Sequence, residues 1–119
     1  EYGNRIGIWR VLDLLDRLRL PAAVATNLLA ARRHPELPAA FAARGFEPVA
    51  HGLSASRMVT ARMNEVEELA HILEARDGLA ALWPGATGWL GQDHGATPNS
   101  TRLLRDAGFD YALDWANDG

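Results

Sequence analysis

The sequence predicts an α/β fold in which parallel strands are joined by crossover helices. Helical and strand-like segments alternate four times along the 119 residues. Each strand candidate is a short apolar run whose length suits a buried strand, and each run ends in small or polar residues. This alternation is typical of a doubly wound sheet or of part of a (β/α) barrel.

The composition is that of a globular chain, and it excludes several kinds of chemistry. Hydrophobic residues make up 48% of the chain and the formal net charge is -3. These values argue against disorder and give no electrostatic reason to expect nucleic acid or an anionic membrane as a partner. The chain has no cysteine, and all twelve basic residues are arginine. Thiol nucleophiles, cysteine-based zinc sites and Schiff-base lysines are therefore excluded within this stretch.

The first half of the chain predicts two helices and two strands. Residues 5–18 carry one apolar stripe at helical spacing, formed by Ile8, Val11, Leu12, Leu15 and Leu18. Residues 22–27 form the first strand candidate. A second helix is expected from Pro35 to just before Gly45. Residues 46–51 form the second strand candidate, although Pro48 within it removes a donor of the sheet ladder.

The second half continues the same alternation. Asn64 and Glu67 have the spacing of a capping box, so a helix should start there and end at Gly78. Residues 87–92 form the third strand candidate. A further helix is expected from Thr97 as its cap, with Pro98 in the first turn and Gly108 after its end. Residues 110–115 form the fourth strand candidate.

Polar residues follow every strand candidate, and parallel strands would gather them on one rim. They are Thr26 and Asn27, His51 and Gly52, Gly91 to Asp93, and Asp114 with Asn117 and Asp118 close behind. Functional sites of such folds lie at the carboxyl ends of the strands, which makes His51 a candidate site residue. The competing interpretation is that a chain turns polar wherever it leaves a sheet. The pattern alone leaves both open.

Other motifs are weaker. The run Gly52–Ser56 lacks the closing glycine of a nucleophile elbow. The four histidines show no close pair at metal-ligand spacing. Two of them, His34 and His71, are expected at the surface, whereas His94 follows a strand and is a further site candidate. Trp89 either stacks on a ligand or fills the core, and packing roles are expected for Trp9, Trp83 and Trp115.

Four stretches of the chain resemble the polysaccharide deacetylase superfamily, in the right order and over nearly the whole length. They are "EYGNRIGIWRVLDLLDRLRLPAAVATN", "HPELPAAFAARGFEPVAHG", "GWLGQ" and "TPNSTRLLRDAGFDYALDWANDG". They look closest to the branch of allantoinase-like and cyclic-imidase-like proteins. The resemblance implies a distorted (β/α)7 barrel. Residues 1–119 would supply the central portion of its single catalytic domain, without the first strand and the C-terminal part.

The resemblance also implies roles for single residues. His51 matches the histidine of the second motif of the family, and the catalytic aspartate of the family would lie upstream of Glu1. Metal-dependent members carry another histidine where this chain has Ala55. This departure favours the metal-independent branch without a cofactor, with a divalent metal as the alternative. We expect His51 and Asp114 to be catalytic, and the expected substrate-binding residues are Glu1, Asn27, Trp89 and Gln92.

The expected function is hydrolysis of carbon–nitrogen bonds other than peptide bonds, in an amide, ureide or cyclic imide. The expected partner is a small-molecule amide or amino-sugar substrate, the expected location is the cytoplasm, and neither nucleic acid nor a membrane is expected to bind. One alternative is a metal-dependent N-deacetylase of amino-sugar polymers such as chitin or peptidoglycan. Another is a non-catalytic piece that associates with a second chain or with its own copies, because part of a barrel exposes strand edges.

Overall fold

The computed structural model describes residues 2–115 and contains a sheet of four parallel strands. The strands are β1 (Ala23–Thr26), β2 (Glu47–Ala50), β3 (Gly88–Leu90) and β4 (Tyr111–Leu113). They lie in the order β1-β2-β3-β4, and each pair of neighbours is parallel. The order follows the chain without the reversal that marks a doubly wound sheet, so the sheet has the topology of a barrel segment. The predicted α/β class is confirmed.

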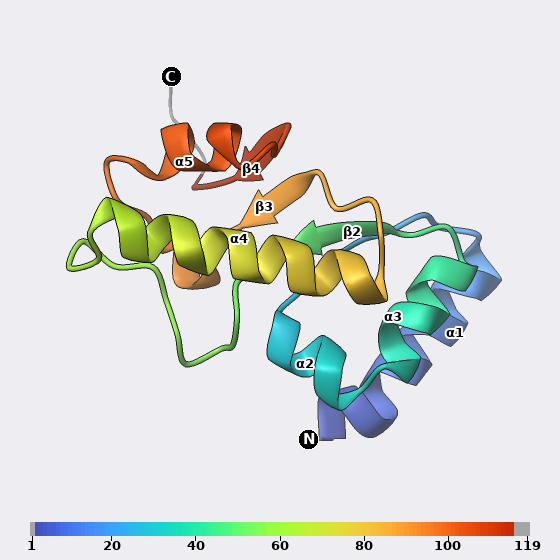
Figure 1. Cartoon of the computed structure of the whole chain (residues 1–119). Coiled ribbons are helices and arrows are strands. Elements are labelled where there is room, and N and C mark those ends of the chain that lie inside the picture. The colour runs from blue at the N-terminus through green and yellow to red at the C-terminus, as the bar shows by residue number, and fades with distance from the viewer. Residues whose placement is uncertain (1, 116–119) are drawn as a thin grey trace.

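Helices connect each strand to the next (Figure 1). A π-helical turn, η1 (Gly3–Gly7), leads into α1 (Ile8–Leu18) ahead of β1. Two short helices, α2 (Leu28–Arg33) and α3 (Glu36–Ala43), join β1 to β2. The long helix α4 (Glu65–Leu82) joins β2 to β3, and the turn η2 (Gln92–His94) and helix α5 (Ser100–Asp106) join β3 to β4. Figure 1 shows α4 running alongside the sheet. Helices α1 and α3 lie next to each other near the carboxyl-terminal end of α4.

The core lies between the helices and one face of the sheet. Successive residues of a strand point to opposite faces. Ala50 of β2 and Trp89 of β3 belong to one buried apolar cluster with side chains of the helices, among them Leu12, Leu28, Phe41, Ile72, Leu79 and Leu104. Glu47, Gly88 and Tyr111 lie on the opposite face, as their register and the contact between them show. This second face corresponds to the interior of a barrel.

The start of α2 depends on the turn that follows β2. The side chain of Asn27 accepts a hydrogen bond from the amide of Ala30 at 2.8 Å, which is an ordinary N-cap. The next orphan donors at this helix start are the amides of Leu28 and Leu29. They donate to the carbonyl oxygens of Gly52 at 3.0 Å and Leu53 at 2.8 Å. The segment after His51 is therefore fixed to α2 through its backbone.

Two helix boundaries differ from the expectation. The capping box of Asn64 and Glu67 is present, but α4 continues past Gly78 to Leu82. Gly78 has a packing role instead, since a Cβ atom on it would lie 2.5 Å from a methyl group of Leu28. A glycine inside a helix is tolerated where another element approaches this closely. The connection between β1 and β2 also contains two helices, because α2 is a separate turn-and-a-half before α3.

The expected start of the last helix, with Thr97 as the cap and Pro98 in the first turn, is wrong. Helix α5 begins at Ser100, and its N-cap position is Asn99. The Thr97 amide donates to the Ser100 hydroxyl at 2.7 Å, and the Asn99 amide donates to the Thr97 hydroxyl at 3.0 Å. These bonds form a turn of their own, so the residues that look like a helix start belong to the loop before the helix.

Pro48 fits within β2 because its nitrogen, which has no hydrogen to donate, points to the β3 side at a position where the two strands are not paired. The amides of Glu47 and His51 donate to the carbonyl oxygens of Ala22 and Thr26 on the β1 side. Alternate residues of a parallel strand donate to the same neighbour, so the nitrogen of Pro48 faces β3. Pairing between β2 and β3 begins only at Val49. The strand is therefore not interrupted.

Some expectations about packing are wrong. Trp83 is buried as expected, but Trp9 and Trp115 are exposed, the latter by 71%. His71 was expected at the surface and is 3% exposed. Of the apolar stripe on α1, only Leu12 is fully buried, while Val11 and Leu18 face outward. Within residues 2–115, no helix is both long and apolar enough to cross a membrane.

Candidate active site at the carboxyl ends of the strands

The parallel sheet brings the polar strand ends to one rim, as expected. His51 follows β2 directly, Gly91 to His94 follow β3, and Asp114 follows β4. Both β2 and β4 pair in register with β3, so their last residues lie level with its end. The common direction of the strands therefore places His51 next to the loop after β3.

The imidazole of His51 is held across two strands. Its Nδ1 atom lies 2.7 Å from the carbonyl oxygen of Leu90, the last residue of β3. A carbonyl oxygen can only accept a hydrogen bond, so Nδ1 must carry the proton that it donates. The neutral ring then has an unprotonated Nε2, which can accept a proton from a substrate or a water molecule. This geometry selects the tautomer that a general base needs.

The backbone around His51 is equally well fixed. Its amide donates to the carbonyl oxygen of Thr26 at 3.2 Å. Gly52 follows in the left-handed region with φ at +69°, a conformation that glycine adopts without the steric cost borne by other residues. Because the carbonyl oxygens of Gly52 and Leu53 accept from the start of α2, the histidine sits at the end of a rigid strand and before an anchored turn.

The loop after β3 contains two consecutive strained residues. Asp93 and His94 have φ angles of 47° and 53°, in the left-handed region where non-glycine residues cost about 1–2 kcal/mol each. The loop is also tightly packed, because a Cβ atom on Gly91 would lie 2.6 Å from the carbonyl oxygen of Gly95. Strain of this kind gathers at functional sites, where the surrounding structure maintains it. Nothing in the sequence pattern around Asp93 signals this conformation.

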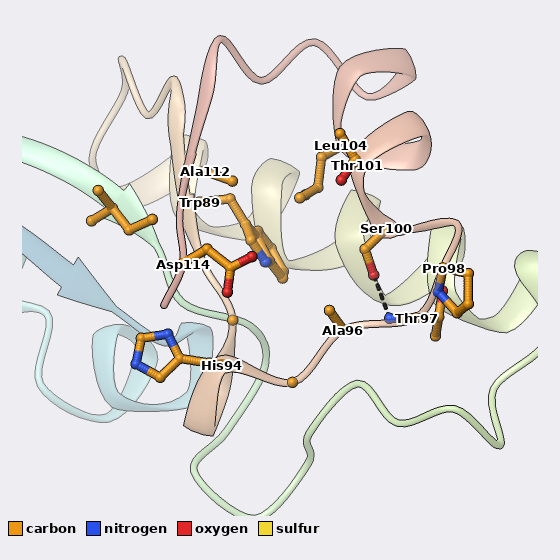
Figure 2. A pocket seen from close by; sticks show the side chains of 13 residues that line it. Trp89, His94, Ala96, Thr97, Pro98, Ser100, Thr101, Leu104, Ala112 and Asp114 are labelled. Atoms are coloured by element: carbon orange, nitrogen blue, oxygen red, sulfur yellow. Dashed lines mark hydrogen bonds between the residues drawn. The ribbon is translucent and has the colours of Figure 1, made fainter. Parts of the chain in front are cut away.

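A cavity of about 270 Å³ lies beside the ends of β3 and β4. Figure 2 shows Asp114, His94 and Trp89 among its lining side chains. The ring of His94 packs on Trp115 with 4.2 Å between the ring centroids, and an oxygen of Asp114 accepts from the amide of Trp115 at 2.8 Å. His51 is not among the lining residues, so the two expected catalytic residues do not share this cavity.

One wall of this cavity is held by a buried carboxylate that sequence reasoning missed. Glu68 of α4 is 1% exposed. It accepts a hydrogen bond from the hydroxyl of Thr97 at 2.5 Å and another from the hydroxyl of Ser100. Both donors lie about thirty residues further along the chain, and no local pattern links them to Glu68. The carboxylate fixes the loop that lines the cavity.

The expected substrate-binding residues are distributed over several places. Trp89 is buried against Phe109, edge to face, and only part of it reaches the cavity beside Asp114. Gln92 is 5% exposed, with its amide behind Gly52 rather than on the open rim. Asn27 caps α2 and lines a separate cavity of about 220 Å³ near β1. Glu1 lies outside the described residues, as do Asn117 and Asp118.

The described residues offer no complete set of metal ligands. Between residues 2 and 115, no three side chains of the histidine, aspartate or glutamate type gather as a cation site would require. Ala55, four residues after His51, is exposed and has no donor atom. Ligands from this part of the chain alone therefore do not fit a divalent cation.

Comparison with solved structures gives close matches over nearly the whole chain. The crystal structure of Puue Allantoinase superposes with a TM-score of 0.86 at 34% identity over 98% of this chain. A Pseudomonas aeruginosa PAO1 protein described as a probable polysaccharide deacetylase gives 0.85 at 35% identity, also over 98%. A polysaccharide deacetylase-type protein of Mycobacterium smegmatis gives 0.85 at 24% identity over 93% of the chain, which supports the fold alone.

The chain spans 38% of the length of each of these three solved chains. Neither the family models nor the curated proteins gave a match.

Proposed function

Because the chain belongs to the polysaccharide deacetylase superfamily, we propose that it forms the central part of a hydrolase of carbon–nitrogen bonds other than peptide bonds. The two structures that match at 34% and 35% identity are Puue Allantoinase and a protein described as a probable polysaccharide deacetylase. The carrying observation is the hydrogen bond from His51 to the carbonyl oxygen of Leu90, which leaves a proton-accepting nitrogen at the rim of the sheet.

The proposed role of His51 is proton transfer. Hydrolysis of an amide requires that water lose a proton as it attacks the carbonyl carbon, and that the departing nitrogen gain one. The free Nε2 of His51 takes the first proton and returns it to the leaving nitrogen. Its Nδ1 keeps the hydrogen bond to Leu90 throughout, so the ring stays aligned in both protonation states.

The loop after β3 is the proposed source of a donor for the oxyanion that forms on the carbonyl oxygen. Backbone amides held in an unusual conformation are effective oxyanion donors because they need no rearrangement during the reaction. Asp93 has such a backbone conformation, whereas the amide of His94 already donates to the carbonyl oxygen of Gly91 at 3.1 Å. Asp114 follows β4 and lines the cavity beside that strand, where its exposed carboxylate is suited to bind an N–H group of a substrate that reaches from His51 into this cavity.

The proposed substrates are small amides, ureides or cyclic imides. Their planar N–H and C=O groups match a rim that combines one proton acceptor, one carboxylate and a rigid backbone. The matches to Puue Allantoinase at 34% identity and to a probable polysaccharide deacetylase at 35% do not separate this class from amino-sugar polymers. Support for the small substrates comes from Ala55, which stands where metal-dependent members of the family carry a second histidine.

The test is His51→Gln in the full-length protein that carries this chain. The loss of general acid–base catalysis should lower kcat for the best ureide or cyclic imide substrate about 100-fold or more, with the circular dichroism spectrum unchanged. His34→Gln is the matched control, because His34 lies in the turn between α2 and α3 and pairs with Glu36 away from the rim. Wild-type turnover by His51→Gln on every amide accepted by the parent would refute the proposal.

The same experiment separates the two substrate classes. Acetylated glucosamine oligomers are assayed beside the ureides, and both assays are repeated after dialysis against a chelator. Deacetylation of the oligomers, lost on dialysis and restored by a divalent cation, would indicate the metal-dependent deacetylase instead.

A further inference from the structure

The cavity beside the ends of β3 and β4 has one wall that belongs to neither strand. This wall is the segment 95–100, which follows η2 and ends in the first residue of α5. Figure 2 shows Thr97 and Ser100 on one side of the cavity and Asp114 on the other. Among residues 2–115, the backbone hydrogen bonds of the segment are local, such as the one from the Ser100 amide to the Thr97 carbonyl oxygen at 3.1 Å. Its hydrogen bonds to a different part of the fold are made by side chains.

Those side-chain hydrogen bonds converge on Glu68 of α4. The hydroxyls of Thr97 and Ser100 each have one hydrogen, and each donates it to a different oxygen of the Glu68 carboxylate. Each hydroxyl oxygen also accepts a backbone amide, from Asn99 at 3.0 Å and from Thr97 at 2.7 Å respectively. The carboxylate therefore holds the backbone of the wall through two hydroxyl groups. A carboxylate can accept at both oxygens, whereas the amide of a glutamine accepts at one only.

The other end of the wall is held at Gly95. A Cβ atom on Gly95 would overlap the carbonyl oxygen of Val59, so the two backbones lie in direct contact. Val59 is buried and belongs to the loop between β2 and α4. This loop begins at His51 and leads into the helix that carries Glu68. The connection from β2 to α4 therefore holds the wall at both ends, by its loop and by its helix.

We propose that Glu68 is a positioning residue for substrate binding, which fixes the wall that receives the part of the substrate remote from the bond to be cleaved. The inference rests on the proposed function, in which the substrate reaches from His51 into this cavity. Glu68 does not line the cavity and is 1% exposed, so it acts through Thr97 and Ser100 rather than on the substrate itself.

The effect of Glu68 should appear in affinity rather than in the chemical step. A wall that is already ordered loses little freedom when a ligand binds, whereas a loosened wall must be ordered at the expense of affinity. Loss of an interaction that is equal in the ground state and the transition state raises KM and leaves kcat unchanged. Proton transfer by His51 takes place outside this cavity, since His51 does not line it.

The test measures the Kd of hydantoin, a cyclic ureide of the proposed substrate class, by titration calorimetry. The full-length protein carries His51→Gln, so that the ligand is not consumed. Adding Asp114→Asn should weaken binding, which shows that hydantoin uses this cavity. Adding Glu68→Gln should raise Kd about five- to tenfold, the equivalent of one net hydrogen bond. In the protein with His51 intact, Glu68→Gln should raise KM by the same factor and leave kcat within about twofold.

Two substitutions of Thr97 form a matched pair. Thr97→Val keeps the shape and removes the hydroxyl, so it should weaken binding as Glu68→Gln does. Thr97→Ser keeps the hydroxyl and should retain most of the affinity. Because both partners act through one hydrogen bond, Glu68→Gln with Thr97→Val should weaken binding by less than the product of the single effects. The Thr97 pair carries the test if Glu68→Gln does not fold.

The matched control is Glu65→Gln. The ion pair of Glu65 with Arg102 also joins α4 to α5, but it is exposed, and neither residue lines the cavity. Its Kd for hydantoin should equal that of the parent protein. An equal loss of affinity in Glu65→Gln and Glu68→Gln would overturn the inference, because it would mean that general loosening of the helix pair is responsible.

An unchanged Kd in folded Glu68→Gln and Thr97→Val would also overturn the inference, as would the absence of hydantoin binding or its insensitivity to Asp114→Asn. The affinity measurement is separate from catalysis. If affinity depends on Glu68 but His51→Gln stays fully active, the inference stands and the proposed function of His51 fails, with KM taking the place of Kd. If His51→Gln is inactive and affinity does not depend on Glu68, the proposed function stands and the inference fails.

Discussion

The hydroxyl of Tyr111 on β4 donates a hydrogen bond to the carboxylate of Glu47 on β2, across the intervening strand β3. The bond passes over Gly88, where a Cβ atom would overlap the tyrosine ring. The contact therefore requires a glycine at this position of the middle strand. The hydrogen bond lies on the sheet face opposite the helices and links β2 to β4 across β3.

Gly88→Ala should destabilise the protein, although alanine is ordinarily the better residue within a strand. The added methyl group forces Tyr111 away from Glu47 or moves β4, and overpacking of this kind costs about 1–3 kcal/mol. Denaturant unfolding measures the change. The control is Gly3→Ala, where a Cβ atom would meet nothing within 4 Å. Equal stability of Gly88→Ala and the wild type would contradict the described contact.

Alkaline pH should weaken the fold through Tyr111. The hydrogen bond to Glu47, with smaller effects of burial and of the Glu47 charge, raises the pKa of Tyr111 to about 12. An unfolded tyrosine titrates near ~10, so between about pH 10 and 12 the unfolded chain binds fewer protons than the folded one. The stabilisation is complete below that window and is lost as the pH rises through it.

Tyr111→Phe should remove this part of the alkaline slope and lower the stability at pH 7 by about 1 kcal/mol, the usual net effect of one hydrogen bond. Unfolding free energies between pH 8 and pH 12 are compared with those of Tyr2→Phe, whose ring is exposed. Parallel curves for Tyr111→Phe and the wild type would show that the pair has no influence.

Mild acid should destabilise the protein through His71. Its folded pKa lies below the ordinary value because of burial, so between that value and ~6.5 the unfolded chain binds more protons. Stability therefore falls as the pH drops through this window and is constant above it. His71→Gln removes the titrating group, and its unfolding free energy should change less between pH 7.5 and pH 5. An equal acid slope in both proteins would refute the assignment.

Loss of the Glu68 carboxylate should loosen the cavity wall. Glu68→Ala removes the acceptor for both Thr97 and Ser100 and should lower stability by about 3–6 kcal/mol, since each of the two hydrogen bonds to the carboxylate contributes about 1.5–3 kcal/mol. Amide exchange of residues 97–100 should increase. Glu65→Gln on the same helix is the control, because its ion pair with Arg102 is exposed to solvent and contributes little to stability. Similar losses in both variants would argue against a special role for Glu68.

The sequence predicts the parts of the fold that depend on local pattern. The four strands, the capping box at Asn64 and the position of His51 after β2 follow from periodicity, cap chemistry and strand ends. The end of α4 does not, because Gly78 serves contact with Leu28, fifty residues earlier. Local pattern cannot distinguish a glycine that ends a helix from one that accommodates a neighbour.

The candidate site was only partly predictable for the same reason. His51 stands at a strand end, where topology alone brings it to the rim. The burial of His71 and Glu68 depends on partners from distant segments, and both look like solvent-facing positions of a charged helix in the sequence. Asp114 lines the cavity beside β3 and β4 and His51 does not, which depends on the register of the strands and on the alternation of side chains along them.

Pro48 makes the hydrogen bonding between β2 and β3 uneven along the two strands. Main-chain pairing of β2 with β3 begins at Val49, and towards the amino end of β2 the side chain of Glu47 instead contacts Tyr111 of β4. A change of twist between β2 and β3 at that end would break no ladder hydrogen bond, whereas at the other end it would have to disturb the pairing next to His51.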